Sequence, residues 1–301
     1  MKITLIGCGS IGKLWLAALH QQQHEVQGWL RLPKEELSLY INNVNGDTFN
    51  QVIASNDLAH LKASQLIIVC LKAWQVSAAL NPLSDLIATD CPILLLHNGM
   101  GTLDELQFNQ HPLLAGTTTH AAWQDNHQVF HVAQGITHIG AVNQPAQNYS
   151  YIADILHQAL PDVAWHNQII TTCWQKLAVN CVINPLTVLY DCHNGELLNY
   201  SDQIQLLIHE IYQVMVAEGL YTEEQSLSHH INRVITDTHQ NFSSMLQDVR
   251  NQRRTEIDYI TGYLLKRARL YGINTPENDR IYHLIKYREQ HYDSFGTGLS
   301  G

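Results

Sequence analysis

Three polar side chains recur one helical turn apart within the largely apolar segment 168–187. Lys176, Asn180 and Asn184 are spaced at four residues, so a helix would place them within roughly 80° of arc. A lysine and two asparagines do not fit an apolar interface unless they have polar partners. The stripe is therefore a candidate catalytic constellation, and an ordinary solvent-exposed face is the alternative. Pro185 beside it predicts that the helix bends or ends there.

A second polar cluster follows later in the chain. We expect Ser244 to open a long helix that includes Glu256 and Tyr259, and plain helix capping by Ser244 is the alternative. Between the two clusters, Asn194 and Gly195 form a dipeptide that is typical of a turn. The second cluster comprises Asn241, Ser243, Ser244, Asp248 and Glu256.

The chain begins with a glycine-rich turn between an apolar run, 3–6, and a helical pattern, 10–22. In such a turn Gly7 permits the sharp bend, Gly9 lets the backbone approach a pyrophosphate, and Gly12 allows close helix packing. The free N–H groups of the following helix then face the anion. The context predicts dinucleotide binding, although a glycine turn without a ligand is the alternative. The motif GxGxxG is formed by Gly7, Cys8, Gly9, Ser10, Ile11 and Gly12.

The end of the second predicted strand, 26–30, indicates which dinucleotide binds. No Asp or Glu stands at its tip to accept a bond from a ribose 2′-hydroxyl; Glu25 precedes the strand. Arg31 follows instead, and its charged donor fork suits a 2′-phosphate. We expect Lys34 to assist. The sequence therefore predicts NADPH/NADP+, with an ordinary surface arginine as the alternative.

Two further polar residues follow buried-looking strands. Lys72 comes after the apolar run 66–71, and Asn98 after the run 93–96. Ligands of open α/β sheets bind beyond the carboxyl ends of the strands, so both residues are candidates for cofactor contact. The backbone of residues 99–101 is a candidate to lie against the nicotinamide.

Strand and helix signals alternate through the first half of the chain. A crossover helix is predicted over 76–87, and short strands over 113–119, 128–132 and 137–141. This pattern indicates a doubly wound, mostly parallel α/β sheet, a Rossmann domain, whereas the second half has helical periodicity. We expect an NADP-binding domain over 1–165, an all-α substrate and catalytic domain over 166–292, and a flexible tail over 293–301, with the site in the interdomain cleft.

The composition excludes several function classes. A net charge of −10 with 17 Lys and Arg and no basic run argues against nucleic-acid binding. The longest apolar runs have about six residues, too short to span a membrane. The six cysteines contain no CxxC pair and indicate reduced thiols in the cytoplasm. The 18 histidines show no ligand spacing, so we expect no metal. Self-association is compatible with the sequence and is not predicted by it.

Taken together, these motifs resemble those of the ketopantoate reductase (2-dehydropantoate 2-reductase) family over about residues 1–290. The lysine-bearing helix and the Ser-Ser-Met-Leu-Gln-Asp motif are specific to that family. The resemblance rests on residues 7–12, 71–75 (LKAWQ), 97–102 (HNGMGT), 116–120 (GTTTH), 174–187 (WQKLAVNCVINPLT), 194–197 (NGEL) and 243–248 (SSMLQD).

The resemblance implies an oxidoreductase that reduces ketopantoate to pantoate with NADPH, a step of pantothenate and coenzyme A biosynthesis. It implies that Lys176 is the general acid that protonates the C2 oxygen. Asn180 and Asn184 would hold the C4 hydroxyl, Ser244 would bind the carboxylate, and Asn98 would contact substrate or cofactor.

The resemblance also implies further contacts. Asn194 and Asn241 would lie beside the substrate. Lys72 and the backbone of Ala122 would meet the cofactor. Glu256 is similar to the acidic residue of the family that lies near cofactor and lysine, which implies a role in both catalysis and cofactor binding.

Two other functions compete with this one. Another NADP-dependent β-hydroxyacid dehydrogenase of the same two-domain plan, acting on 3-hydroxyisobutyrate or 6-phosphogluconate, would also carry a Lys-x-x-x-Asn helix. Asn184, Ser244 and the His-Asn-Gly-Met-Gly run favour ketopantoate. A non-catalytic NADPH sensor is the second alternative, but a sensor has no need of a proton donor at Lys176.

Overall fold

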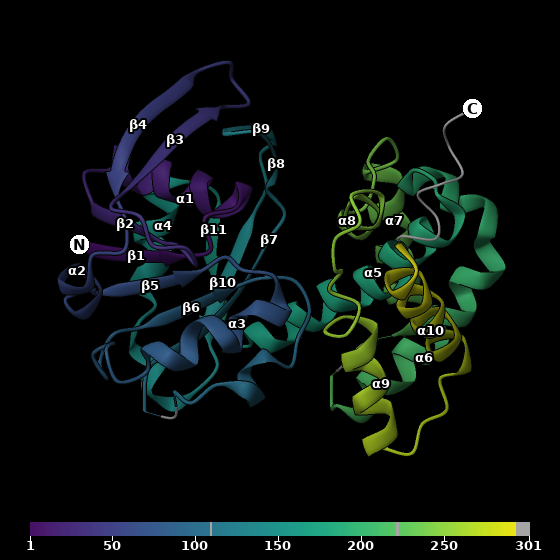
Figure 1. Ribbon diagram of the computed structural model, residues 1–301. Coiled ribbons are helices and arrows are strands. Elements are labelled where there is room, and N and C mark those ends of the chain that lie inside the picture. The colour runs from purple at the N-terminus through teal and green to yellow at the C-terminus, as the bar shows by residue number, and fades with distance from the viewer. Residues whose placement is uncertain (109, 221–222, 293–301) are drawn as a thin grey trace. The chain divides into compact units, whose positions relative to one another are not determined.

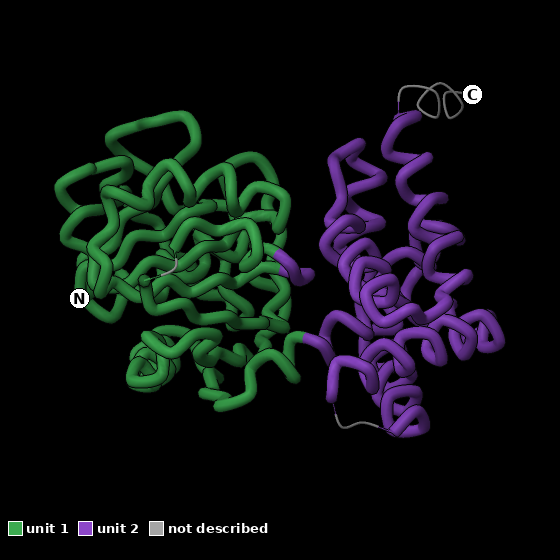
Figure 2. The backbone as a smooth tube through the Cα atoms, turned by 90° about the horizontal axis from the view of Figure 1, so that it is seen from below, with its two compact units in different colours: residues 1–97, 102–173 green, residues 98–101, 174–301 purple. Residues whose placement is uncertain are grey.

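The computed structural model describes residues 1–108, 110–220 and 223–292 (Figure 1). The chain forms two compact units (Figure 2). Unit 1 holds residues 1–97 and 102–173, and unit 2 holds residues 98–101 and 174–301. The sequence placed the domain boundary near residue 165, whereas the contacts divide the chain after Cys173, inside a long helix. The predicted tail over 293–301 lies outside the described residues.

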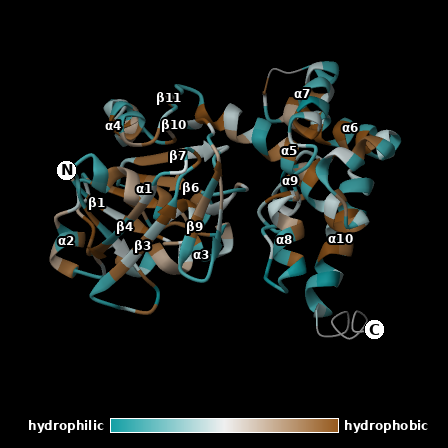
Figure 3. Cartoon of the chain, turned by 90° about the horizontal axis from the view of Figure 1, so that it is seen from above, coloured by the Kyte–Doolittle hydropathy of each residue, from teal (hydrophilic) through white to brown (hydrophobic). Residues whose placement is uncertain are grey.

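A seven-stranded, mostly parallel sheet forms the centre of unit 1, which confirms the predicted fold class. Its strands are predominantly hydrophobic (Figure 3), as expected for strands covered on both faces. The strand β10 (Thr137–Ala141) runs antiparallel to β7 (Leu113–Thr118), and the other neighbours are parallel. The order is β11-β10-β7-β6-β5-β1-β2, with β11 (Val163–Trp165), β6 (Ile93–Leu96), β5 (Leu66–Val69), β1 (Lys2–Ile6) and β2 (Glu25–Trp29).

Short helices connect the strands of unit 1. The predicted crossover helix over 76–87 is shorter and earlier, as α3 (Ala73–Leu80) with a 3₁₀ turn over Asn81–Leu83. Asn81 before Pro82 keeps helical backbone angles, so the early end follows from Pro82 itself, which has no N–H to donate to the carbonyl four residues earlier. The other helices are α1 (Ser10–Gln21), α2 (Leu58–Lys62) and α4 (Tyr151–Ala159), with 3₁₀ turns over Thr102–Glu105 and Gln144–Asn148.

A second sheet, of four strands, covers α1 on its other side (Figure 1). Leu39, Ile41 and Phe49 of this sheet join α1 in one core. Apart from the strand predicted over 128–132, this sheet was not predicted, because its strands are exposed on one face and carry many polar residues. The order is β4-β3-β9-β8, with β4 (Thr48–Ala54), β3 (Glu36–Asn42), β9 (Gln128–Ala133) and β8 (Ala121–Asp125).

Unit 2 is helical, as predicted, around the helix α5 (Ile169–Tyr190). Buried side chains of α5, among them Trp174, Leu177 and Val182, pack against the surrounding helices. The described part of this unit contains a 3₁₀ helix over Asn194–Tyr200 and the helices α6 (Ser201–Ala217), α7 (Glu224–Asp237), α8 (Ser244–Arg250), α9 (Thr261–Leu270) and α10 (Pro276–Gln290).

The structure corrects two helix predictions in unit 2. Of the predicted bend or end at Pro185, an end is wrong: α5 continues to Tyr190, because residues 181–188 are all buried and core packing outweighs the proline. The long helix expected from Ser244 to Tyr259 is instead the short α8, followed by an irregular segment. Gln252 there has φ +53°, the left-handed conformation that terminates helices.

No helix among the described residues is long and apolar enough to cross a membrane. The same residues contain no cluster of three or more His, Cys, Asp or Glu side chains that could hold a metal ion.

Candidate active site

The glycine-rich turn of unit 1 has the shape that a bound dinucleotide requires. Gly7 has φ +97°, and a Cβ atom there would lie 2.7 Å from the carbonyl oxygen of Cys70. A Cβ atom on Gly12 would collide with the carbonyl oxygen of Gly7. Beside Gly9, in contrast, nothing lies within 4 Å of an added Cβ. The first and third glycines therefore pack the turn, and the second borders open space.

The N-terminus of α1 is available to an anion. Its N-cap residue, Gly9, supplies no side-chain hydrogen bond, and the first turn carries no acidic residue. The first N–H groups of a helix have no partner within the helix, so they can bind a phosphate group there. The residues of this turn thus fit a dinucleotide.

Arg31 and Lys34 are exposed on the loop that follows β2. This loop is fastened by Asn56, which sequence reasoning missed. The Asn56 Oδ1 atom accepts bonds from the N–H groups of Leu30 and Lys34, both at 3.3 Å, and its Nδ2 atom donates to Leu30 O at 3.0 Å. The loop backbone is therefore held while the Arg31 side chain stays in solvent.

Two further predicted cofactor residues, Lys72 and Ala122, lie elsewhere in unit 1. Lys72 is the N-cap of α3, at the carboxyl end of β5 as predicted, and its N–H donates to Gln75 Oε1 at 3.2 Å. Ala122 lies on β8 at an irregularity in the pairing with β9. Bulges of this kind are frequent beside functional sites.

In unit 2, residues 98–101 bind to the segment 256–263. Asn98 Nδ2 donates to Glu256 Oε2 at 3.5 Å, and the N–H of Met100 donates to Tyr259 O at 2.8 Å. Gly99 has φ +80°, and a Cβ atom there would lie 2.5 Å from Tyr259 O. The tetrapeptide thus belongs to unit 2, although its neighbours in the sequence belong to unit 1.

The polar stripe of α5 is not a solvent-exposed face. Lys176 and Asn180 are half-buried, and Asn184 is buried. Asn184 is also tied to α8: its carbonyl oxygen accepts a bond from Thr187 Oγ1 at 2.9 Å, and that hydroxyl lies 2.6 Å from Ser243 Oγ. Thr187, which sequence reasoning missed, therefore joins the stripe to the second polar cluster.

Some residues of the second polar cluster have structural roles, and others are exposed and could contact a ligand. Ser243, not Ser244, is the N-cap of α8, since its Oγ accepts a bond from Leu246 N at 3.0 Å. Ser244 is exposed, and so is Asn241. Asp248 is buried, and its carboxylate lies 3.4 Å from Arg253 Nε. The alternative interpretation, helix capping by Ser244, is therefore wrong, and Ser244 is left without that structural role.

Asn194 is brought to this cluster through the backbone. Its N–H donates to Asn241 O at 2.9 Å, and its Nδ2 donates to Thr238 Oγ1 at 2.9 Å. The Asn194 side chain is buried, and its Oδ1 atom has no hydrogen-bond partner among the described residues. A buried amide oxygen without a donor is costly, so this atom is suited to a ligand hydroxyl.

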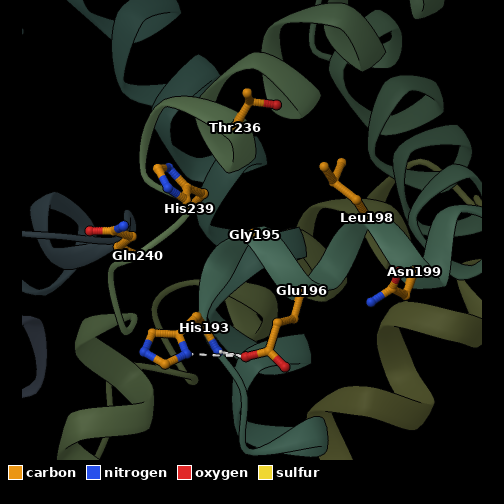
Figure 4. A pocket seen from close by; sticks show the side chains of 8 residues that line it. All are labelled: His193, Gly195, Glu196, Leu198, Asn199, Thr236, His239 and Gln240. Atoms are coloured by element: carbon orange, nitrogen blue, oxygen red, sulfur yellow. Dashed lines mark hydrogen bonds and ion pairs between the residues drawn. The ribbon is translucent and has the colours of Figure 1, made fainter.

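An open depression of about 860 Å³ lies next to Asn194 on unit 2 (Figure 4). It does not include Lys176, Asn180 or Asn184. Glu196 at its edge accepts bonds from the N–H and the ring of His193, which lower the pKa of that carboxyl group. Its lining residues are His193, Gly195, Glu196, Leu198, Asn199, Thr236, His239 and Gln240.

The two units together define a class of protein. A glycine-rich turn on a Rossmann sheet, joined by one long helix to a helical unit with a half-buried lysine on that helix, is the plan of a two-unit oxidoreductase that uses a nicotinamide dinucleotide. The family model "Ketopantoate reductase PanE/ApbA" matches residues 3–144, and "Ketopantoate reductase PanE/ApbA C terminal" matches residues 168–289. The chain belongs to the ketopantoate reductase family, as its motifs predicted.

Similar proteins cover the whole chain. The 2-dehydropantoate 2-reductase of Yersinia pestis is 54% identical over 301 residues, which are 100% of this chain and 99% of that protein. The one of Escherichia coli O157:H7 is 52% identical over 299 residues, 99% of each. A solved ternary structure of D-mandelate dehydrogenase with NADH and anilino(oxo)acetate has a TM-score of 0.87 at 24% identity, covering 97% of this chain and 100% of that one. This last likeness shows the fold alone.

Proposed function

We propose that the protein reduces 2-dehydropantoate (ketopantoate) to pantoate with NADPH, and so acts in pantothenate biosynthesis. The observation that carries this proposal is the 54% identity, over the full length, to a 2-dehydropantoate 2-reductase. The residues on which the sequence resemblance rests lie in both units, in helices and strands as well as in the loops between them. They supply the groups that reduction of a ketone needs, as follows.

Lys176 is the general acid of this proposal. NADPH, when bound, would supply the hydride for C2 of the substrate, and the negative charge would then develop on the C2 oxygen. The Lys176 ammonium donates its proton to that oxygen, and before the transfer its charge stabilises the alkoxide. Its half-buried position on α5 strengthens this interaction, because charges attract more strongly where water is partly excluded.

Unit 2 also supplies the substrate contacts. The amides of Asn180 and Asn184 bind the C4 hydroxyl, and the exposed Ser244 binds the carboxylate. The unpartnered Asn194 Oδ1 atom is a further acceptor for a hydroxyl. Asn241 lies beside it through the backbone bond to Asn194.

The cofactor contacts come mainly from unit 1. The pyrophosphate binds at residues 7–12 and the uncapped N-terminus of α1. Arg31 pairs with the 2′-phosphate, and Lys72 and the backbone of Ala122 contact the remainder of the dinucleotide. From unit 2, Asn98 and Glu256 contribute, and Glu256 orients the Asn98 amide by accepting its bond.

The proposal also assigns a role to each part of the chain and names the cellular compartment. Residues 1–165 serve mainly the cofactor and residues 166–292 mainly the substrate, with Asn98 and Glu256 as the exceptions. The protein works in the cytoplasm with a small-molecule substrate, and nucleic acid is not a partner, since the net charge is −10. Catalysis relies on Lys176 for the proton.

NADPH oxidation by the purified protein tests the function. We expect kcat/KM to be at least tenfold higher with ketopantoate than with benzoylformate, the 2-oxo acid that corresponds to mandelate. In the oxidative direction, 3-hydroxyisobutyrate and 6-phosphogluconate with NADP+ should be poorer still. A preference for benzoylformate would move the protein to the class of its structural neighbour. NADPH binding without oxidation by any of these acids would favour a sensor.

A further inference from the structure

Lys13 is a buried lysine in the first turn of α1, directly after the glycine-rich motif. Only 6% of its surface is exposed. Lysine is almost never buried to this extent without a partner, because removing much of the water around an ammonium group is costly. The Lys13 ammonium nitrogen itself keeps a small contact with solvent. Lys13 therefore needs an explanation that the packing of α1 does not provide.

No protein group neutralises this charge in the part of the chain that the structure describes. The Lys13 side chain forms no hydrogen bond or ion pair there, and the titratable group that influences it is the Cys8 thiol. Burial raises the pKa of Cys8 to about 12, so this thiol is uncharged at neutral pH. Burial also lowers the pKa of Lys13, as expected for an ammonium group without a countercharge.

The direction of the helix places the Lys13 side chain toward the cofactor turn. Side chains of an α-helix tilt toward its N-terminus and lie over the preceding turn. For Lys13 that turn contains Gly9 and Ser10, four and three residues earlier. The influence of Cys8, which lies in the glycine motif itself, agrees with this direction.

The same region is open to an anion. Nothing lies within 4 Å of an added Cβ at Gly9, and the N-terminus of α1 has no side-chain cap. A largely buried lysine without a countercharge among the described residues, uncapped N–H groups and open space thus come together at one end of α1.

We propose that Lys13 is a cofactor-binding residue whose ammonium group pairs with the pyrophosphate of the bound dinucleotide. This inference rests on the proposed function only in that the ligand is a dinucleotide. It assigns to Lys13 a different phosphate from the one assigned to Arg31, which follows β2. It also explains the burial: the charge is unfavourable in the ligand-free protein and is neutralised when the pyrophosphate binds.

Binding measurements on two variants test this assignment. In Lys13→Gln and Lys13→Met, dissociation constants are measured by fluorescence for NADPH and NADH, and by calorimetry for 2′-AMP, which has the 2′-phosphate but no pyrophosphate. Bonds to charged groups contribute about 1.5–3 kcal/mol. We therefore expect NADPH and NADH to weaken by the same factor, about tenfold or more, and 2′-AMP to bind as before.

The control is Lys62→Gln, which makes the same change of charge at an exposed position of unit 1. It should leave all three dissociation constants unchanged. The thermal midpoint of the ligand-free protein is a second readout. Because the buried charge is unfavourable without its ligand, Lys13→Met should be at least as stable as the parent protein.

Three results would overturn the proposal. The first is unchanged NADPH binding. The second is a loss of affinity confined to NADPH and 2′-AMP, which would assign Lys13 to the 2′-phosphate. The third is a lower thermal midpoint of the variants that accounts for their weaker binding. The experiment contains no substrate, so its outcome is independent of whether ketopantoate is reduced.

Discussion

The N–H of Met100 donates to the carbonyl oxygen of Tyr259 at 2.8 Å, so the tetrapeptide 98–101, which follows β6 and His97, is bound to the helical unit. At the base of this tetrapeptide, His97 Nε2 and Thr102 Oγ1 lie 2.9 Å apart within unit 1. At its end, Gly101 faces the ring of Tyr263, which in turn packs against Trp174, two residues before Lys176. Asn98 is thereby held by the same packing that holds the start of the lysine-bearing helix.

Replacing Gly101 should therefore impair catalysis more than stability. Gly101 has φ +99°, and a Cβ atom would lie 2.9 Å from Tyr263 Cδ2. Because misplacing a binding group by about 1 Å can cost on the order of a hundredfold in rate, Gly101→Ala should lower kcat/KM for ketopantoate at least tenfold. The control is Gly46→Ala, where φ is +89° but nothing lies within 4 Å. It should lower only the thermal midpoint, and equal kinetic losses in both variants would contradict the argument.

Arg31 should determine the choice of cofactor. Its side chain is exposed on a loop that Asn56 fastens, so Arg31→Ala should leave the fold intact. We expect NADPH to bind about tenfold more weakly, the lower end of the range for bonds to charged groups because water screens an exposed charge. NADH should change little. Equal losses for the two cofactors, measured by fluorescence titration, would show that Arg31 supports the loop instead.

The sequence predicted the parts of this site that have local signals. The glycine motif, the strand ends before Lys72 and Asn98, and the four-residue spacing of the α5 stripe depend only on neighbours in the chain. The roles of Asn56, Thr187 and Tyr259 could not be predicted, since each acts across more than 20 residues. The end of α5 was misplaced because a proline has a local preference that core packing overrides.

Substitutions of the adjacent residues Ser243 and Ser244 should affect different properties, stability in the first case and substrate binding in the second. Ser243 caps α8 and contacts Thr187, so Ser243→Ala should lower the free energy of unfolding by about 1 kcal/mol. Ser244 is exposed and does not cap the helix. Ser244→Ala should instead raise the KM for ketopantoate about tenfold with little change for NADPH. Urea unfolding and steady-state kinetics on both variants distinguish the roles. The assignment of the carboxylate contact is wrong if Ser244→Ala affects stability alone.

His120 should make the protein sensitive to acid. Burial, with the neighbouring His131, lowers the pKa of His120 to about 4. Its Nδ1 atom accepts a bond from Gly135 N at 3.2 Å, and its Nε2 atom is buried without a partner among the described residues. A pKa below the unfolded value favours the neutral form. The contribution to stability is therefore full above about pH 6.5 and is lost progressively as pH falls toward 4.

Urea unfolding at several pH values tests this dependence. The parent protein should lose more stability between about pH 6.5 and 4 than His120→Gln, which has no ring to protonate. His127 lies in the turn between β8 and β9 and is exposed. His127→Gln should therefore show the same change of stability with pH as the parent protein. A parallel slope in His120→Gln and the parent would show that other groups cause the acid sensitivity.

The role of Lys176 depends on the chemistry of its surroundings. Adding a hydride to a ketone leaves negative charge on the oxygen, which a nearby donor must neutralise. Within the stripe of α5, the other members, Asn180 and Asn184, are neutral amides that can donate hydrogen bonds but not a proton. Among the three, the proton must therefore come from Lys176.

Substituting Lys176 should separate chemistry from binding. Loss of a general acid typically costs about 10²–10⁴ in rate, so Lys176→Ala should lower kcat by at least two orders of magnitude. NADPH binding, which relies on unit 1, should remain nearly intact by fluorescence. Lys176→Arg should restore little activity, because a guanidinium group does not release its proton near neutral pH. Asn180→Ala is the comparison: it removes a contact one turn away and should act mainly on KM. A folded Lys176→Ala protein that keeps more than about a tenth of the parent kcat, with hydride transfer shown to be rate-limiting, would refute the assignment.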